Sequence, residues 1–261
     1  MFSRLGIQDY NKEAANSQQN VLDIAKLAGV DVLWIENNNG GCKKVCDRVD
    51  TIYIDVDAQN RLCDGEYCFD EALLAHLNMK IAQQKSTNTL VVLHMIGSHG
   101  PTYFRRYPKE HRLFTPDCQR SDIQNCSDTE LVNTYDNTIA YTDFVLNNII
   151  GGLSQIASDN SLSASMLYVS DHGESLGEKG IYLHGLPYMF APKEQTHIPM
   201  LYWQSDELSA TQSECFANVA TNPASHDNLF DTLLGLLQVN SVLYNPNLDL
   251  LSPCKRVAQL Q

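Results

Sequence analysis

Residues 89–94, Thr-Leu-Val-Val-Leu-His, constrain the fold of this chain more than any other segment. The run is almost continuously apolar and rich in β-branched side chains, which is typical of a central strand buried on both faces of a parallel sheet. Because such strands are joined by crossover connections that are usually helical, the run predicts a sheet covered by helices.

Strands and helices alternate along the rest of the chain. Apolar runs predict strands at residues 30–35, 51–56, 166–170 and 198–203, and helical periodicity predicts helices at 20–28, after a cap at Asp70, at about 128–150, and after Ser225 or Asp227. We therefore expect a three-layer α/β/α sandwich around a mostly parallel central sheet. The sequence has no repeat and no internal linker, so residues 1–261 are expected to form one domain.

The composition limits the partners of this chain. A formal net charge of −13 and a pI near 4.9 argue against a nucleic-acid partner, because a phosphate backbone requires a basic surface. No stretch reaches the roughly 18 consecutive apolar residues of a membrane span. We expect a soluble, monomeric domain whose abrupt start at Met1 indicates that it is part of a longer protein.

Six of the eight cysteines form close pairs in polar loops, namely Cys42 with Cys46, Cys63 with Cys68, and Cys118 with Cys126. Such pairs predict disulfides that staple loops in an oxidising compartment. Cys215 and Cys254 are a candidate fourth, long-range pair. The alternative is a structural zinc site built from the first four cysteines, whose spacings exceed the two-residue gap of zinc ribbons.

The strand predicted at 166–170 ends directly before Asp171 and His172. His94 ends the strand at 89–94, and His99 follows it. Right-handed crossovers bring the carboxyl ends of parallel strands to one edge of the sheet, where His184 can also reach. Carboxylate and imidazole groups suit zinc, so this edge is a candidate metal site. The simpler alternative to a metal site is that Asp171 only caps the end of the strand and that the His172 imidazole is solvated.

The remaining histidines and the one dense basic cluster have simpler interpretations. We expect His76 and His111 to be solvated surface groups, and His197 and His226 to cap elements or support the site. Arg105, Arg106, Lys109 and Arg112 would either meet anionic lipid headgroups or belong to an ordinary solvated loop.

Several motifs together resemble those of membrane phosphoethanolamine transferases, which include the lipid A modifying and mobile colistin resistance enzymes. They are Ser-Asp-His-Gly-Glu-Ser-Leu-Gly-Glu at 170–178, Tyr-Leu-His-Gly at 182–185, Ala-Pro-Lys-Glu-Gln at 191–195, Gly-Ser-His-Gly-Pro at 97–101, and Tyr-Asp-Asn at 135–137. This family belongs to the alkaline phosphatase and sulfatase-like superfamily. The resemblance covers nearly the whole chain.

The resemblance implies a site that contains one or two zinc ions. Asp171 and His172 match zinc ligands, and His99 and His184 match active-site histidines that contact the phosphoryl group, bind a second zinc, or both. Asn39, Lys43 and His94 are candidate substrate-binding residues, and His94 could instead support the site. Glu174, together with Glu178, is expected to hold the metal loop through hydrogen bonds.

The implied reaction transfers phosphoethanolamine from phosphatidylethanolamine to a lipid A phosphate through a phosphorylated threonine, which confers resistance to cationic peptides such as polymyxin. Members of the family carry a Cys-Gly-Thr nucleophile motif shortly before Pro-Cys-Met-Phe-Ser, and this chain opens with Met-Phe-Ser. We therefore expect the nucleophile, a glutamate ligand and membrane helices to precede residue 1. The implied location is the periplasmic face of the inner membrane, and residues 1–261 alone are expected to be inactive.

Two alternatives remain at this point. The first is a sulfatase or phosphatase of the same superfamily, although the sulfatase motif Cys-x-Pro-x-Arg does not occur in these residues. The second is a disulfide-stapled domain that binds lipid headgroups without turnover.

Overall fold

A computed structural model describes the chain except for residues 39, 58–59, 84–87 and 259–261. Its parallel sheet consists of β1 (Asp31–Glu36), β2 (Asp50–Tyr53) and β3 (Thr89–His94), in the order β2-β1-β3. Both pairings with β1 are parallel. Parallel strands alternating with helices agree with the α/β class that the sequence predicts.

The other strands pair differently from the single parallel sheet that we expected. β4 (Ser165–Val169) pairs with β7 (Met200–Gln204) antiparallel, and β5 (Ser175–Leu176) forms a short hairpin with β6 (Tyr182–Leu183). The backbone N–H of Ser170, just after β4, lies 3.4 Å from the carbonyl oxygen of Pro199, just before β7. The segment between the two strands therefore leaves and returns at the carboxyl end of β4. Among the described strands, no pairing joins β3 to β4.

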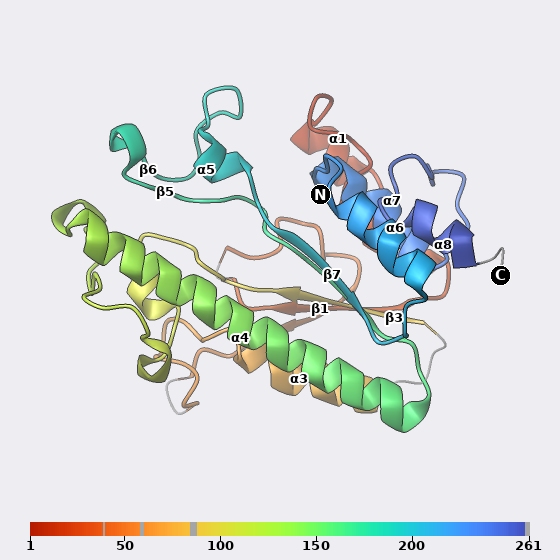
Figure 1. Cartoon of the computed structure of the whole chain (residues 1–261), viewed down its shortest axis with the longest axis horizontal. Coiled ribbons are helices and arrows are strands. Elements are labelled where there is room, and N and C mark those ends of the chain that lie inside the picture. The colour runs from red at the N-terminus through yellow and green to blue at the C-terminus, as the bar shows by residue number, and fades with distance from the viewer. Residues whose placement is uncertain (39, 58–59, 84–87, 259–261) are drawn as a thin grey trace.

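Helices cover both faces of the strands (Figure 1). The helices are α1 (Lys12–Ser17), α2 (Val21–Leu27), α3 (Ala72–Ala82), α4 (Asp128–Asn160), α5 (Lys193–Thr196), α6 (Ala210–Ala220), α7 (Leu229–Leu236) and α8 (Ser252–Ala258). Val32 and Trp34 of β1 pack in one core with α2 and α7, whereas Leu33 and Ile35 pack with Leu73 of α3. This alternation along one strand produces the three layers.

Two helix boundaries differ from the prediction. α4 begins at the capping box of Ser127 and Glu130 but continues ten residues past the predicted end at 150, because Leu153 and Ala157 keep packing on the same face. α3 has Glu71 at its N-cap position with no side-chain cap, so the prediction that Asp70 caps this helix is wrong. Ser225 caps the short 3₁₀ turn that leads into α7.

All four predicted disulfides are present, including the long-range bridge from Cys215 to Cys254 that joins α6 to α8. The alternative of a zinc site built from Cys42, Cys46, Cys63 and Cys68 is therefore wrong, because Cys42 bonds Cys46 and Cys63 bonds Cys68. Within the described residues, no helix is both long enough and apolar enough to cross a membrane.

Candidate active site

The metal motif sits on a tightly packed turn at the end of β4. Gly173 donates its N–H to the carbonyl of Gln195 at 3.0 Å, and a Cβ at this position would lie 2.1 Å from the carbonyl oxygen of Glu194. Only glycine allows α5 to approach the turn this closely. The turn is therefore fixed by its packing, and it carries Asp171 and His172 at a defined place.

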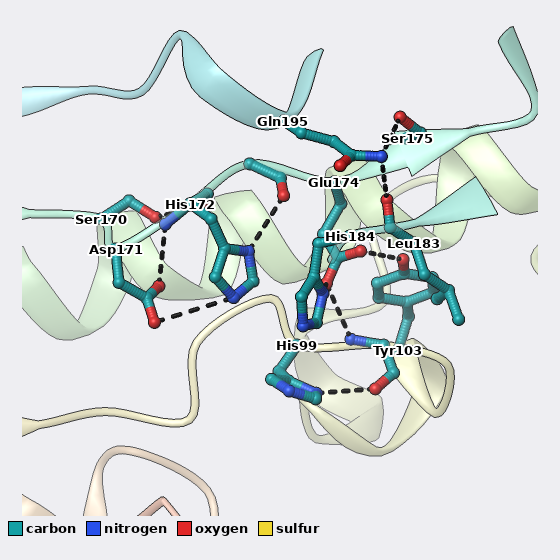
Figure 2. A network of polar contacts seen from close by, with 12 residues as sticks. His99, Tyr103, Ser170, Asp171, His172, Glu174, Ser175, Leu183, His184 and Gln195 are labelled. Carbon is teal, nitrogen blue, oxygen red and sulfur yellow. Dashed lines mark hydrogen bonds and ion pairs between the residues drawn. The ribbon is translucent and has the colours of Figure 1, made fainter. Parts of the chain in front are cut away.

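Three predicted site histidines converge from three segments (Figure 2). The ring centroids of His172 and His184 lie 3.8 Å apart, those of His99 and His184 lie 5.1 Å apart, and those of His99 and His172 lie 6.2 Å apart. His99 follows β3, His172 follows β4, and His184 follows β6. The strand-end argument thus located these residues correctly, and their individual roles stay predictions.

Glu174 orients the ring of His184. Its Oε1 accepts hydrogen bonds from His184 Nδ1 at 2.9 Å and from the backbone N–H of Gly100 at 3.3 Å, and its Oε2 accepts one from the Tyr103 hydroxyl at 3.2 Å. Only 3% of the Glu174 side chain is exposed. Burial and the adjacent Glu174 charge raise the pKa of Tyr103, so its hydroxyl stays a donor. The predicted supporting role of Glu174 agrees with these contacts.

His99 and His172 are oriented by backbone carbonyls. His99 Nδ1 lies 2.6 Å from the carbonyl oxygen of Gly100, and His172 Nδ1 lies 3.0 Å from that of Gly173. A carbonyl and an ionised carboxylate can only accept, so Nδ1 carries the hydrogen in all three neutral rings. Each histidine therefore leaves Nε2 as the free lone pair, which is the tautomer that a metal ligand requires.

The donor atoms at this site fit a zinc ion. Ligand atoms of His172, Glu174 and His184 all lie within 4.8 Å of one another. Asp171 adds a carboxylate whose Oδ2 is 3.7 Å from His172 Nε2, while its Oδ1 accepts the N–H of His172. Both Glu174 oxygens already accept hydrogen bonds, which favours an orienting role for Glu174, and the ligand role of Asp171 stays a prediction. Nitrogen and oxygen donors of this kind suit zinc.

Two buried charged residues, which the sequence did not single out as site residues, hold the turn that carries His99. Asp70 accepts the N–H groups of Ile96 and Gly97 at 2.9 and 2.8 Å, and Arg106 donates from Nε to the carbonyl of His99 at 2.9 Å. Asp70 is 4% exposed and Arg106 is 5% exposed. Burial raises the pKa of Asp70 and lowers the pKa of Arg106, and their mutual attraction opposes both shifts.

The predicted basic cluster does not form one surface. Arg106 lies in the interior, Arg105 pairs with Asp64 and Glu66, and Arg112 pairs with Asp117. Lys109 is exposed at the surface. The idea that these four cations jointly meet anionic headgroups is therefore wrong, because carboxylates already neutralise two of them.

His94 has a carboxylate partner that the sequence did not suggest. Its Nδ1 lies 2.8 Å from Oε2 of Glu36, a residue only 4% exposed, and its ring packs edge-on against Trp34 at 5.2 Å. Lys43 lines the same cleft as His94. Substrate contacts by Lys43 and His94 stay predictions, and Asn39 lies outside the described residues.

The other histidines divide between support and surface. His226 Nε2 lies 2.8 Å from the carbonyl oxygen of Ser170 and so supports the end of β4. His197 is exposed, and His76 is half-buried. The surface prediction for His111 is wrong, because its ring packs against Tyr141 and Phe144 at centroid distances of 5.0 and 4.3 Å.

A cleft of about 950 Å³ opens at this site. His94, His99, Asp171 and His172 line it at the carboxyl ends of β3 and β4. Apolar side chains of β3, β4, α4 and α7 line much of the remainder, together with polar side chains that include Lys43, Lys44 and Arg48. A phosphorylated headgroup in this cleft would lie against His99, Asp171 and His172.

An α/β fold with an Asp-His motif and clustered histidines at its strand ends defines a class of metal-dependent phosphate and sulfate ester enzymes. The chain matches the sulfatase family over residues 1–239 and belongs to that family. This match confirms the predicted superfamily and fold class.

Within that family the chain is similar to phosphoethanolamine transferases. It is 43% identical over 264 residues to phosphoethanolamine transferase EptA of Salmonella typhimurium, covering 99% of this chain and 47% of that protein. It is 38% identical over 248 residues to phosphatidylethanolamine transferase Mcr-1 of Escherichia coli, covering 92% and 44%. The chain thus spans about half the length of these relatives. The resemblance that the motifs indicated is confirmed.

A solved structure supports the same grouping. The soluble domain of lipooligosaccharide phosphoethanolamine transferase A from Neisseria meningitidis superposes with a TM-score of 0.88 at 41% identity. The superposition covers 97% of this chain and 76% of that one. The integral membrane form of the same protein is covered over 47% of its length.

Proposed function

We propose that the protein transfers phosphoethanolamine from phosphatidylethanolamine to a phosphate of lipid A at the periplasmic face of the inner membrane. The convergence of the rings of His99, His172 and His184, with Asp171 beside His172, in a chain similar to transferases of this kind, supports the proposal. One related protein is a Kdo(2)-lipid A phosphoethanolamine 7''-transferase of Salmonella typhimurium, at 30% identity.

Asp171 and His172 would hold one zinc ion, and His99 and His184 would contact the phosphoryl group or hold a second zinc. When bound, zinc polarises a phosphoryl oxygen and lowers the pKa of an attacking hydroxyl. The attacking group in this proposal is a threonine hydroxyl in another part of the protein. This assignment rests on the resemblance and on the nitrogen and oxygen donors described above.

His184 is the best placed proton donor among the three histidines. In its protonated form, Nδ1 stays bonded to the Glu174 carboxylate, which stabilises an imidazolium more than a carbonyl does. Nε2 can then protonate the diacylglycerol oxygen as its bond to phosphorus breaks and the bond from threonine to phosphorus forms. In the second half of the reaction, an oxygen of the lipid A phosphate attacks the phosphothreonine and the threonine hydroxyl is restored.

The consequence for the cell surface follows from charge. Each transfer places an ammonium group on a lipid A phosphate, which offsets its negative charge and weakens the binding of cationic peptides such as polymyxin.

The test uses the whole protein with zinc, labelled phosphatidylethanolamine and lipid A in detergent, and measures diacylglycerol release and lipid A mass. We expect both products, and we expect Asp171→Ala and His184→Ala to abolish them. His76→Ala, a change at a half-buried histidine of α3 that does not line the cleft, is the matched control. Zinc-loaded protein that releases no diacylglycerol would contradict the proposal and favour a headgroup-binding domain. Faster hydrolysis of a simple phosphate or sulfate ester would favour the phosphatase or sulfatase alternative.

A further inference from the structure

The loop between β6 and α5 exposes an apolar tip beside the active site. Tyr188, Met189 and Phe190 are 66%, 82% and 71% exposed. Within the described part of the chain, they are the only three consecutive large apolar side chains that are all exposed. Folded proteins rarely leave such a run in water unless it contacts a partner. We infer that residues 188–190, the apolar tip, insert into the surface of a lipid bilayer and hold the active site against the membrane.

Hydrogen bonds fix the base of this loop at the active site. The side chain of Gln195 is buried, and its Nε2 donates to the carbonyl oxygen of Leu183 at 2.9 Å, which joins the two ends of the loop (Figure 2). The backbone carbonyl of Gln195 accepts the N–H of Gly173, in the turn that carries His172, at 3.0 Å. His184 is the first residue of the loop after β6. The apolar tip is therefore held at a defined place relative to both histidines.

The tip can leave water without stranding a charge. Its loop projects away from the strands of the core (Figure 1), and residues 185–192 contain no charged side chain. The N–H groups of Phe190 and Ala191 donate to the carbonyl oxygen of Pro187 at 2.8 and 3.0 Å. A backbone N–H that keeps such a partner loses little when it enters an apolar environment. The loop is therefore built to place its side chains, and not its backbone, in contact with the partner.

The chemistry of the tip and its flank favours lipid as the partner. Aromatic side chains with a polar end, such as Tyr188, collect at the interface between headgroups and acyl chains, where Met189 and Phe190 can reach the apolar side. Lys193 follows the loop with its side chain 85% exposed, although Glu194 lies 3.9 Å from its Nζ. An exposed ammonium beside apolar side chains suits the phosphates of lipid headgroups.

The choice of a bilayer rests in one respect on the proposed function. Under that function, both substrates are lipids, so their headgroups have to pass from a bilayer to the histidines. His184, at the base of the loop, lies 5.1 Å from His99 between ring centroids. With the tip inserted, a headgroup would have to rise from the bilayer only by about the height of this one loop to reach the site.

An introduced tryptophan tests the inference on the whole protein in vesicles of phosphatidylethanolamine and phosphatidylcholine. Phe190→Trp places the probe at the tip. Leu27→Trp is the matched control, because Leu27 is 72% exposed at the end of α2, which leads into the amino end of β1, away from the site. The emission of the parent protein is subtracted from both. Interfacial side chains lie about 5–10 Å into the boundary of headgroups and acyl chains, so lipids brominated on the upper acyl chain should quench the probe at position 190 at least about twofold more than the control.

Quenching by the brominated lipid decides the outcome, and Met189→Trp, at the most exposed position of the tip, should give the same result. Equal quenching at positions 190 and 27 would overturn the inference. Acrylamide in the water then gives the reason: a probe shielded from acrylamide would be covered by protein, and an accessible one would remain in water. Quenching does not depend on transfer, so a lipid-quenched tip in a protein that releases no diacylglycerol would refute the proposed function and leave this inference standing. An active protein with an unquenched tip would do the reverse.

Discussion

Replacing Glu174 by glutamine removes one negative charge while keeping the shape of the side chain. In the parent protein this carboxylate accepts hydrogen bonds from His184, Gly100 and Tyr103. The glutamine amide has one acceptor oxygen and one donor nitrogen, so at most two of the three bonds survive with their present geometry. The perturbation therefore reaches the ring of His184 directly.

The magnitude follows from the bond between Glu174 and His184. A charge-assisted hydrogen bond contributes about 1.5–3 kcal/mol and a neutral one about 0.5–1.5 kcal/mol, so the exchange costs about 1–1.5 kcal/mol. That difference corresponds to roughly a five- to tenfold loss in kcat/KM if the bond strengthens by this amount between the free enzyme and the transition state. If His184 is protonated in the transition state, the variant also loses the attraction between the Glu174 carboxylate and the imidazolium. The expected decrease in kcat/KM then approaches about 100-fold.

The assay is the rate of diacylglycerol release by the whole protein at saturating zinc, with the melting temperature measured in parallel. Glu178→Gln is the matched control, because Glu178 is exposed and its side chain accepts the N–H of Leu176 at 2.8 Å without touching the histidines. We expect Glu178→Gln to stay within about twofold of the parent. A Glu174→Gln rate within that same range, or an equal loss in both variants, would refute the orienting role.

Three further predictions concern stability and are measured by urea unfolding. Asp70→Ala should lower the free energy of unfolding by about 3–5 kcal/mol, because it leaves three buried hydrogen-bond donors without an acceptor. Two of these donors are backbone N–H groups. Replacing both Cys215 and Cys254 by serine should cost about 4 kcal/mol, since the bridge closes a separation of 39 residues. Burial opposes ionisation of Asp23, yet hydrogen bonds from Arg48 outweigh it and lower the pKa of Asp23 below 3.8. The ionised carboxylate therefore stabilises the folded state above about pH 4, and this contribution is lost as the pH falls below that value. In Asp23→Asn, the free energy of unfolding should decrease less steeply as the pH falls below about 4.

The sequence predicted that His99 and His172 come together, because each follows a strand, and the structure places their rings 6.2 Å apart. The single parallel sheet on which that prediction relied is not observed among the described strands, since β4 pairs with β7 and not with β3. The pairing of Cys215 with Cys254 was left open by the sequence, because cysteine positions do not show which pair will bond. The predicted helix boundaries were wrong where tertiary packing overrides local sequence signals. In α4 the helix continues through the two glycines after residue 150.

Asp70 shows why the supporting residues could not be predicted. An aspartate directly before an amphipathic run has the signature of a helix cap. Its side chain instead accepts N–H groups from Ile96 and Gly97, 26 and 27 residues further along the chain. Arg106 likewise lies in a surface-like basic sequence and is buried by tertiary contacts. Such roles depend on distances that no local pattern encodes.

The orientation of two of the three histidines, His99 and His172, depends on the glycines beside them. His99 and His172 each face the carbonyl oxygen of the glycine that follows. A Cβ on Gly100 would lie 2.6 Å from side-chain atoms of Tyr103, and one on Gly173 would lie 2.1 Å from a backbone oxygen. A side chain at either position would force its turn to move, and the carbonyl that fixes the histidine tautomer would move with it. The His-Gly pairs therefore encode ring orientation as well as turn shape, whereas His184 takes its orientation from a buried carboxylate.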